Sequence, residues 1–452
     1  MFLLNDVVVY SPTDITRAAC PYELLSVLDE KLGRAQRLEG SGDPMMERAA
    51  RMGDAHELRV LADYRAEFGP FSPLERRGVA EIEDDGEGPD AFRAGLVPAR
   101  EATFEAIAGQ ADVVFQATFF DGRFYGRADF LLKDRLTGGV TDLGGGAGEV
   151  AYAVVDTKLT NKVRASALLQ MAAYADQLLA AGVPVADRVT VHHGNGERSD
   201  ERLGDLLEVY RGERRLVEAL LDAHVSTGAP ASWEQWRDPA GEPEMLALLP
   251  ADIAVTRRAC GRCDYCAREV ARTRDVQLVH GIRGVQRTRL YGHGVRTVDD
   301  LATLRSVVPR MSPVIQDRLT RQARLQVGQL DRIAAADDAG LVVGPGMHLT
   351  APDGAAPPSS SAEVVAALEP IVRFEVTHPE VLGALPEPSL GDIYFDFEGD
   401  PMWSTSGAIE GGLEYLFGLV EEPATVEGNE AYVTFWAHDR AQAQVALIDF
   451  LS

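Results

Sequence analysis

The chain has 452 residues, which is enough for two or three domains with sizeable hydrophobic cores. It is 46% hydrophobic and 25% charged, the composition of an ordinary globular protein, with no apolar run long enough to span a membrane and no basic start typical of a secretory signal, so we expect a cytoplasmic protein without a membrane partner. The formal net charge of −26 argues against a surface that binds nucleic acid everywhere, because phosphate binding relies on Lys and Arg.

The N-terminal segment contains the first strong helix signal. Ser11 is a favourable N-cap, and Pro12 would occupy the first helical position. The pair Cys20-Pro21 should end or kink this helix about two turns later. The segment is therefore expected to deliver the Cys20 thiol to a fixed place.

Two helices and a strand are expected next. One helix is predicted from Asp43 to Phe68 and carries His56, and another from Pro98 to Gly109, with its proline in the first turn. The run Val113–Phe119 reads as a strand, and Asp121-Gly122 as the turn that follows it.

Two further predicted strands carry a pair of carboxylates. Asp129 lies in an aromatic and branched run at 126–132, and Asp156 and Lys158 close a second apolar run at 151–159. The glycine-rich connection, with glycines at 138–139 and 144–146, predicts a hairpin or loop between them. Antiparallel pairing would bring Asp129 and Asp156 together, and Lys158 would project to the same face as Asp156.

This set of side chains suits metal-assisted hydrolysis. Mg²⁺ and Mn²⁺ prefer oxygen ligands, which two carboxylates on adjacent strands supply without filling the coordination shell. A neighbouring lysine can position the attacking water and offset charge on a pentavalent phosphate. On the next helix, predicted from Ser166 to Ala181, Gln170 and Tyr174 share one face and could reach a phosphate backbone or a metal-bound water.

In this order, Asp129, Asp156-Thr157-Lys158 and Gln170-x-x-x-Tyr174 resemble the active-site signature of the PD-(D/E)XK nucleases, specifically the RecB-like branch. Gly53-Asp54-Ala55-His56 resembles the G-x-x-H context of the upstream histidine in that branch. The resemblance implies an α/β fold with a restriction-endonuclease-like core and helical insertions. It also implies metal ligation by His56, Asp129, Asp156 and the carbonyl of Thr157, catalysis assisted by Lys158, and DNA contacts from Gln170 and Tyr174.

The four cysteines are grouped in a way that suits a metal centre. Cys20 stands alone, whereas Cys260, Cys263 and Cys266 form a C-x₂-C-x₂-C run whose sulfurs are poor disulfide partners for one another. With one more thiolate this run could hold either a [4Fe–4S] cluster or tetrahedral Zn²⁺. RecB-like nucleases of the iron–sulfur type place one cysteine before the nuclease core and three after it. That resemblance implies a [4Fe–4S] cluster, with zinc as the alternative.

The segment around and after the cysteines is basic and glycine-rich. Between Arg257 and Arg296 ten arginines face three acids, a local balance of 10 − 3 = +7 and a candidate DNA-facing patch. Residues 278–303 resemble a helix-hairpin-helix unit, with glycine turns that could approach phosphates and Thr297 as the N-cap of the next helix. We take Arg283 and Arg287 as nucleic-acid contacts here, against the alternative of a simple helical spacer.

The C-terminal part begins after a Pro- and Ser-rich linker at 350–362. Asp396 and Glu398 are two apart on a predicted strand, so they share one face and could hold a second metal site. With strand-like runs at 413–420 and 431–437 and a helix from Asp439, this part resembles the opening of an RNase H-like, DEDD-type exonuclease domain. That fold would need further acids on later elements, so we expect a fragment of a longer protein.

The expected organisation has four parts: a RecB-like nuclease domain at 1–275 closed by the cysteines, a helical region at 276–349, the linker at 350–362, and a partial RNase H-like domain at 363–452. This order resembles large bacterial nuclease–helicase fusions. No Walker A pattern occurs, so a helicase is expected in a missing C-terminal part or in trans.

The expected function is that of a metal-dependent deoxyribonuclease acting on single-stranded DNA or strand ends, in repair, recombination or defence. The alternative is a catalytically inactive nucleic-acid-binding or scaffold module of a larger nuclease–helicase protein, with which the acidic net charge is consistent.

Overall fold

A computed structural model describes residues 1–38, 44–83, 88–135, 150–160, 162–338, 342–343, 349–350, 374–387, 389, 392–401, 403, 412–422 and 432–452. The chain divides into two compact units, the first formed by Met1–Thr16, Glu39–Val217 and Pro386–Ser452, and the second by Arg17–Leu38 and Glu218–Leu385. The glycine-rich connection predicted between the two acid-bearing strands and nearly all of the predicted linker lie outside the described residues.

A six-stranded mixed sheet, in the order β3-β4-β5-β6-β7-β8, forms the centre of the first unit. Its strands are β3 (Val79–Glu81), β4 (Val113–Phe120), β5 (Tyr125–Arg135), β6 (Val150–Lys158), β7 (Val185–His193) and β8 (Arg198–Glu201). The β3–β4 and β6–β7 pairs are parallel, and the other three pairs are antiparallel. The α/β class expected from the sequence is confirmed at this level.

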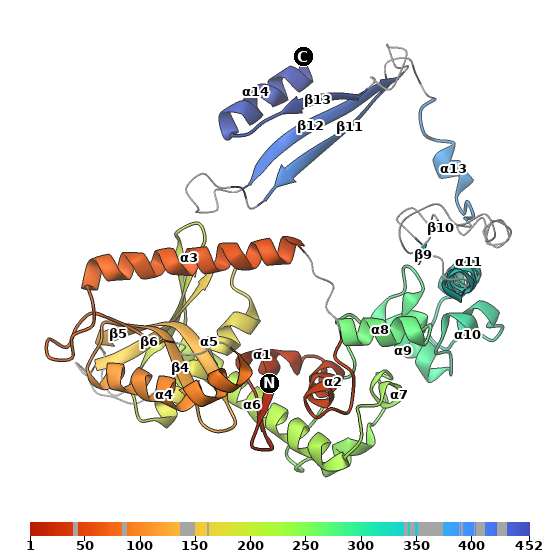
Figure 1. Cartoon of the computed structure of the whole chain (residues 1–452). Helices are drawn as coiled ribbons and strands as arrows, with labels where there is room; N and C mark the ends of the chain where they lie inside the picture. Colours follow the sequence, from red (N-terminus) through yellow and green to blue (C-terminus); the bar gives the residue numbers. More distant parts are fainter. Residues whose placement is uncertain are drawn as a thin grey trace. The chain divides into compact units, whose positions relative to one another are not determined.

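Helices cover this sheet (Figure 1). Helix α3 (Pro44–Phe68) packs against β3 and β6, α4 (Pro89–Ala108) against β4, and α5 (Ala165–Ala180) against β5, β6 and β7. The unit also contains the hairpin of β1 (Phe2–Leu4) and β2 (Val7–Val9), helix α1 (Pro12–Arg17) and the first part of α6 (Leu203–Thr227). Apolar residues of α3, including Tyr64, pack on Phe130 and Val155 of the central strands.

Helix α4 begins earlier than the sequence indicated. The prediction placed its start at Pro98, but the helix begins at Pro89 and Pro98 lies inside it. Both prolines have the fixed φ of a first helical position, and only Pro89 is preceded by a glycine in a non-helical conformation, Gly88 with φ 100°. A helix that begins at a proline was therefore predicted correctly, but the residue at which it begins was predicted wrongly.

Strand β4 contains a local irregularity. Gln116 has a φ of 55°, a conformation that residues other than glycine rarely adopt. Phe115 before it packs on Phe130, the partner of Tyr64 of α3, whereas Phe119 after it stacks on Tyr174 of α5. In a regular strand residues four apart share one face, so this break lets one strand contribute aromatic rings to both helices.

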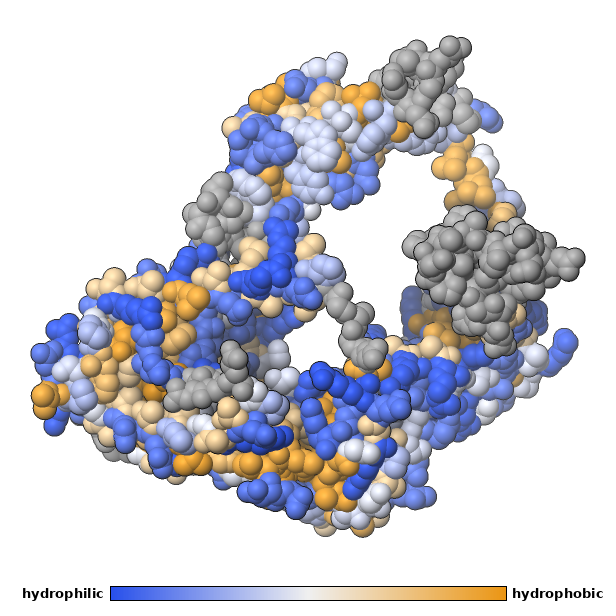
Figure 2. Space-filling view, viewed as in Figure 1, coloured by the Kyte–Doolittle hydropathy of each residue, from blue (hydrophilic) through white to orange (hydrophobic). Residues whose placement is uncertain are grey.

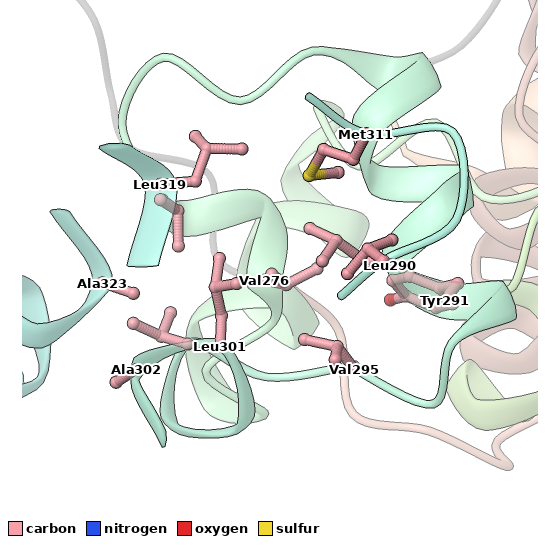
Figure 3. Close-up of a cluster of buried hydrophobic side chains, with 12 residues drawn as sticks. Val276, Leu290, Tyr291, Val295, Leu301, Ala302, Met311, Leu319 and Ala323 are labelled. Carbon is pink, nitrogen blue, oxygen red and sulfur yellow. The ribbon is translucent and has the colours of Figure 1, made fainter. Parts of the chain in front are cut away.

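The second unit is mainly helical. Its elements are α2 (Pro21–Lys31), the last part of α6, α7 (Trp233–Trp236), α8 (Asp264–Arg272), α9 (Gly284–Gly292), α10 (Val298–Thr303), α11 (Pro313–Asp338), α13 (Pro379–Leu382), two 3₁₀ turns at Glu244–Leu248 and Val276–Leu278, and the short pair β9 (Val342–Val343) and β10 (Leu349–Thr350). A buried apolar cluster that includes Val276, Leu290, Leu301 and Leu319 joins α9, α10 and α11 (Figure 3).

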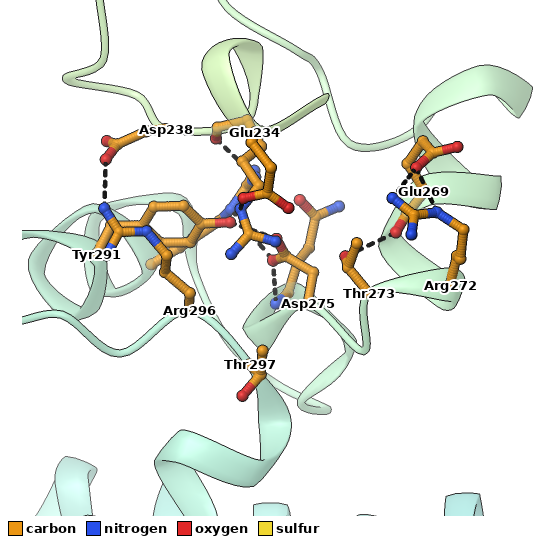
Figure 4. Close-up of polar contacts among 12 residues, drawn as sticks. Glu234, Asp238, Glu269, Arg272, Thr273, Asp275, Tyr291, Arg296 and Thr297 are labelled. Atoms are coloured by element: carbon orange, nitrogen blue, oxygen red, sulfur yellow. Dashed lines mark hydrogen bonds and ion pairs between the residues drawn. The ribbon is translucent and has the colours of Figure 1, made fainter. Parts of the chain in front are cut away.

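A fully buried carboxylate lies beside this cluster (Figure 4). Asp275 accepts hydrogen bonds from the Tyr291 hydroxyl and from the backbone N–H of Gln277. The guanidinium groups of Arg237 and Arg287 lie 3.8 and 3.7 Å from it. Because a buried carboxylate without such partners would be costly, this network fixes the start of the segment that contains α9 and α10.

The described residues from Asp392 onward include a separate antiparallel sheet in the first unit's C-terminal segment. Its strands are β11 (Asp392–Asp400), β12 (Leu413–Glu422) and β13 (Tyr432–Trp436), in that order, and helix α14 (Arg440–Leu451) packs on β12 and β13. The predicted strands and helix are confirmed, and the Asp439 side chain caps α14 by accepting from the N–H of Gln442. In the described part of the chain, no helix combines the length and apolar character needed to cross a membrane.

Gly78 lies just before the edge strand β3, in a backbone conformation whose importance for stability can be tested by mutation. Its φ is 101°, and a Cβ there would lie 2.2 Å from the carbonyl oxygen of Pro70. We expect Gly78→Ala to destabilise the fold by about 2–3 kcal/mol, measured by urea unfolding, because the backbone itself must move. Gly95→Ala in α4, where a Cβ meets nothing within 4 Å, should instead leave stability unchanged or raise it by up to about 1 kcal/mol. Equal unfolding midpoints for the two variants would contradict this account.

Candidate functional site

The two carboxylates predicted on adjacent strands do meet. Strands β5 and β6 are antiparallel with Phe130 opposite Val155, so continuing the ladder brings Asp129 to Asp156. Oδ2 of Asp129 accepts hydrogen bonds from the backbone N–H and from the hydroxyl of Thr157, both at 2.8 Å. Oδ2 of Asp156 lies 2.6 Å from Nζ of Lys158. The structure therefore brings together the strand residues of the predicted site; we call Asp129 and Asp156 the acid pair.

Burial makes this site electrostatically unusual. Asp156 is only 2% exposed, and burial together with the neighbouring Asp129 raises its pKa to about 7, against the opposing effect of Lys158. Burial lowers the pKa of Lys158, but the negative charges of Asp156, Asp129 and Glu57 outweigh it and leave that pKa above its ordinary value. Near neutral pH the site thus holds more negative charge than Lys158 alone can balance, which favours a divalent cation.

His56 lies on α3 and is buried. Its Nε2 is 3.2 Å from the backbone carbonyl oxygen of His192, the residue of β7 that pairs with Thr157. A carbonyl can only accept, so Nε2 carries a proton and Nδ1 is the nitrogen left for a metal. Among the described residues, His56, Asp129 and Asp156 do not form a group with all ligand atoms within 4.8 Å of one another.

Gln170 and Tyr174 are also brought to the acid pair. Nε2 of Gln170 donates to the Tyr174 hydroxyl at 3.0 Å, as expected for residues one helical turn apart. Tyr174 is 3% exposed and stacks on Phe119, and a Cβ on Gly126 would lie 2.5 Å from its ring. Burial raises the pKa of Tyr174, with smaller contributions in the same direction from Asp129 and Asp156. Tyr174 is thus a buried wall of the site, and Gln170 is its more accessible partner.

One acidic residue of this site was not identified from the sequence. Glu57 follows His56 on α3, and its Oε1 accepts a hydrogen bond from Gln116, the irregular residue of β4 that lies level with Asp129. Burial raises the pKa of Glu57, as do Asp129 and Asp54. The G-x-x-H motif ends at His56, one residue before Glu57, so the sequence prediction selected the histidine and not the glutamate. The acidic side chain directly after that histidine was the only sequence feature that could have indicated Glu57.

Comparison of the sequence with models of known protein families and with curated proteins gives no match. The chemistry of the acid pair is therefore argued from its own geometry and from the resemblance of its motifs.

The four cysteines meet in the second unit, and we call them the cysteine group. Their sulfurs all lie within 4.8 Å of one another, a spacing at which a metal can be bound. Cys20 precedes α2, and Cys263 and Cys266 lie at the start of α8. The prediction that Cys20 joins the distant C-x₂-C-x₂-C run at a possible metal site is confirmed.

The two arginines predicted to contact nucleic acid lie in different surroundings. Arg283 is exposed just before α9, whereas Arg287 is 8% exposed with its charge directed to Asp275. Thr297 caps α10 as expected, because its hydroxyl accepts from the N–H of Asp300. Hydrophilic residues dominate the surface around α8 and α9 in Figure 2.

The positive balance of this segment is reduced by acids from outside it. Arg296 pairs with Asp238 at 3.2 Å, and Arg274 pairs with Asp331 at 2.6 Å. The ten arginines are thus not ten free charges, and Arg283 is a better candidate contact than Arg287.

The second candidate metal site lies on β11. Asp396 and Glu398 pair with Gly418 and Leu416 of β12 in a regular register, so they share one face as predicted. Both are exposed. In the described residues they do not form a group of three or more potential ligands within 4.8 Å. They remain a candidate site formed by two exposed carboxylates.

The raised pKa of Asp156 predicts a pH-dependent metal affinity. A divalent ion must displace the proton, so we expect Mn²⁺ affinity to rise about tenfold per pH unit up to about 7 and then to level off. In the metal-free protein a rise in pH has an unfavourable effect, and the effect is on stability. The pKa of Asp156 is higher in the folded protein than in the unfolded chain, so the contribution of Asp156 to the free energy of unfolding falls as pH rises from about 4 to about 7. Calorimetric Mn²⁺ titrations across this range test the first statement, and the slope should vanish in Asp156→Asn. A flat profile in the unaltered protein would refute it.

Glu57 is expected to contribute to the negative electrostatic potential that favours a divalent cation at the acid pair. Replacing it with Gln removes one negative charge near Asp129 and Lys158, which should weaken Mn²⁺ binding on the order of tenfold and lower the pKa of Lys158. Glu47→Gln is the matched control, because Glu47 is exposed on the same helix. If Glu57→Gln binds Mn²⁺ as tightly as Glu47→Gln, then Glu57 has no part in the site.

Proposed function

We propose that this protein is a metal-dependent nuclease that hydrolyses phosphodiester bonds in DNA at the acid pair. The observation that carries the proposal is the meeting of Asp129, Asp156 and Lys158 on two adjacent strands, with Asp156 buried and Lys158 charged. Structural roles rarely require two carboxylates in one buried space, because each disfavours ionisation of the other.

The residues suit the division of labour that hydrolysis needs. The acid pair and the carbonyl of Thr157 offer oxygen ligands for Mg²⁺ or Mn²⁺, and His56 has Nδ1 available nearby. Such an ion supplies a hydroxide-like nucleophile and neutralises charge on the phosphate when it is bound. Lys158 is placed to orient the water and to compensate negative charge in the transition state.

The substrate we propose is single-stranded DNA or a strand end. Gln170 is the partly exposed polar residue beside the acid pair and could contact a phosphate, while Tyr174 supplies a rigid wall. The net charge of −26 disfavours tight non-specific binding to duplex DNA. The motif order also favours a helicase as a partner, in the same polypeptide or in trans.

A second candidate function is a non-catalytic DNA-binding or scaffold module. It is favoured by the ion pair between Lys158 and Asp156 and by the position of His56 outside a compact ligand group. In such a module Lys158 would permanently neutralise Asp156 and no divalent ion would be bound.

Cleavage of a 5′-labelled single-stranded DNA with Mg²⁺ or Mn²⁺ tests the proposal. Lys158→Ala and Asp156→Ala should each lower the rate by about a hundredfold or more, since the first removes a positive charge that stabilises the transition state and the second removes a ligand of the divalent ion. Lys162→Ala, at an exposed lysine close in sequence, is the matched control and should cleave normally. Activity that survives Asp156→Ala but is lost in Asp396→Ala would move the chemistry to β11. DNA binding without cleavage under either metal would support the scaffold module.

A further inference from the structure

We infer that the cysteine group holds one tetrahedral metal ion, Zn²⁺, and not the [4Fe–4S] cluster that the motif order implies. The starting observation is the size of the sulfur tetrahedron. Sγ of Cys20 lies 3.5 Å from Sγ of Cys266 and 3.9 Å from Sγ of Cys263, and the sulfurs of Cys260 and Cys266 are 3.9 Å apart. All four sulfurs lie within 4.8 Å of one another.

These separations match the dimensions of a single zinc ion. A Zn–S bond of about 2.3 Å places the corners of a regular tetrahedron about 3.8 Å apart. In a cubane cluster each cysteine binds a different iron and points away from the cube, which separates the sulfurs by roughly 6 Å. The sulfurs here would have to move apart by more than about 1 Å in every pair to hold that cluster.

The surroundings of the sulfurs oppose such an expansion. Cys20 is the N-cap residue of α2 and Cys263 that of α8, and these two helices pack on each other. The hydroxyl of Tyr265 in α8 donates to Glu30 of α2 at 2.8 Å. Cys20 and Cys266 are 3% and 0% exposed. A larger group would therefore require α2 and α8 to separate.

The donors around the sulfurs suit thiolates bound to one ion. The backbone N–H groups of Arg262 and Cys263 donate to Sγ of Cys260 at 3.3 and 3.2 Å, and the N–H of Cys260 donates to Sγ of Cys20 at 3.3 Å. Two helix N-termini also face the group, and their partial positive charge stabilises negative sulfur. Four thiolates around Zn²⁺ leave a net charge of −2, which these donors offset.

Zinc gives the site a structural and redox-inert role. All four positions are filled by protein, so no position is open for a substrate. The ion joins a segment near the N-terminus to one about 240 residues later, and its binding energy adds directly to folding. This inference is independent of the proposed nuclease activity.

Metal analysis of the full chain tests it. The protein is purified anaerobically from cells supplied with both iron and zinc, and zinc, iron and acid-labile sulfide are counted. We expect about one zinc per chain, no sulfide and no broad visible absorption. The count should be the same in Asp156→Asn, which excludes zinc bound at the acid pair. About four irons with sulfide per chain, or one iron without sulfide, would overturn the assignment.

Metal replacement and a ligand variant provide a second readout. The apoprotein filled with Co²⁺ should show the intense visible bands of tetrahedral thiolate coordination. Cys260→Ser, at the exposed cysteine, should release zinc to a chromogenic chelator at least about tenfold faster than the unaltered chain. Arg262→Ala is the matched control, because it lies between two ligands and contributes only its backbone N–H. Equal release from both variants, or octahedral Co²⁺ spectra, would refute a four-thiolate zinc site.

Discussion

Two carboxylates in one buried space are stable only when positive charge accompanies them, and the centre of the first unit is arranged around that constraint. Oδ2 of Asp129 accepts two hydrogen bonds from Thr157, which fix the orientation of the Asp129 carboxylate. Asp156 has Lys158 at 2.6 Å, yet its pKa remains near 7. One ammonium therefore does not satisfy the pair, and the remaining imbalance is what a divalent cation would remove.

A second constraint, aromatic packing, acts on the irregular strand beside the pair. A regular β4 would present Phe115 and Phe119 on one face, and the sheet could not receive aromatic packing from both α3 and α5 at this level. The positive φ of Gln116 resolves this at a cost of about 1–3 kcal/mol. It also turns the Gln116 amide toward Glu57. Backbone strain at this position thus lies next to Glu57 and the acid pair, and such strain often accompanies function.

The sequence predicted those parts of the fold and the site that depend on the spacing of residues within one segment. Apolar runs predicted β5 and β6, and antiparallel pairing of these two strands placed Asp129 at Asp156. Spacing in the helix likewise placed Gln170 at Tyr174. Cysteine spacing indicated a possible metal site at Cys260, Cys263 and Cys266, and the family resemblance added the distant Cys20. Each of these depends on periodicity or on ligand chemistry, which a single sequence contains.

What the sequence could not show depends on partners remote in the chain. Arg287 resembles a surface arginine until Asp275 is found buried beside it, and the basic segment loses charge to Asp238 and Asp331. The start of α4 was misplaced because Pro89 and Pro98 give the same local signal. Burial and charge compensation are tertiary properties, so residue type alone cannot distinguish a DNA contact from an interior ion pair.

The two proposed metal centres differ in the chemistry of their ligands, and this difference favours different metals at the two sites. Thiolates bind zinc far more strongly than they bind Mg²⁺ or Mn²⁺, whereas the acid pair offers oxygens and leaves positions open for water and phosphate. In the cysteine group all four positions around a zinc ion would be filled by thiolates, and Cys20 and Cys266 are buried. Zinc also binds carboxylate and imidazole ligands more tightly than Mg²⁺ or Mn²⁺ does, so ligand type alone does not keep zinc out of the acid pair. Selectivity at the acid pair would then follow from the abundance of Mg²⁺ or Mn²⁺ and from the need for an exchangeable ion, so a closed thiolate centre and an open carboxylate centre can operate in one polypeptide.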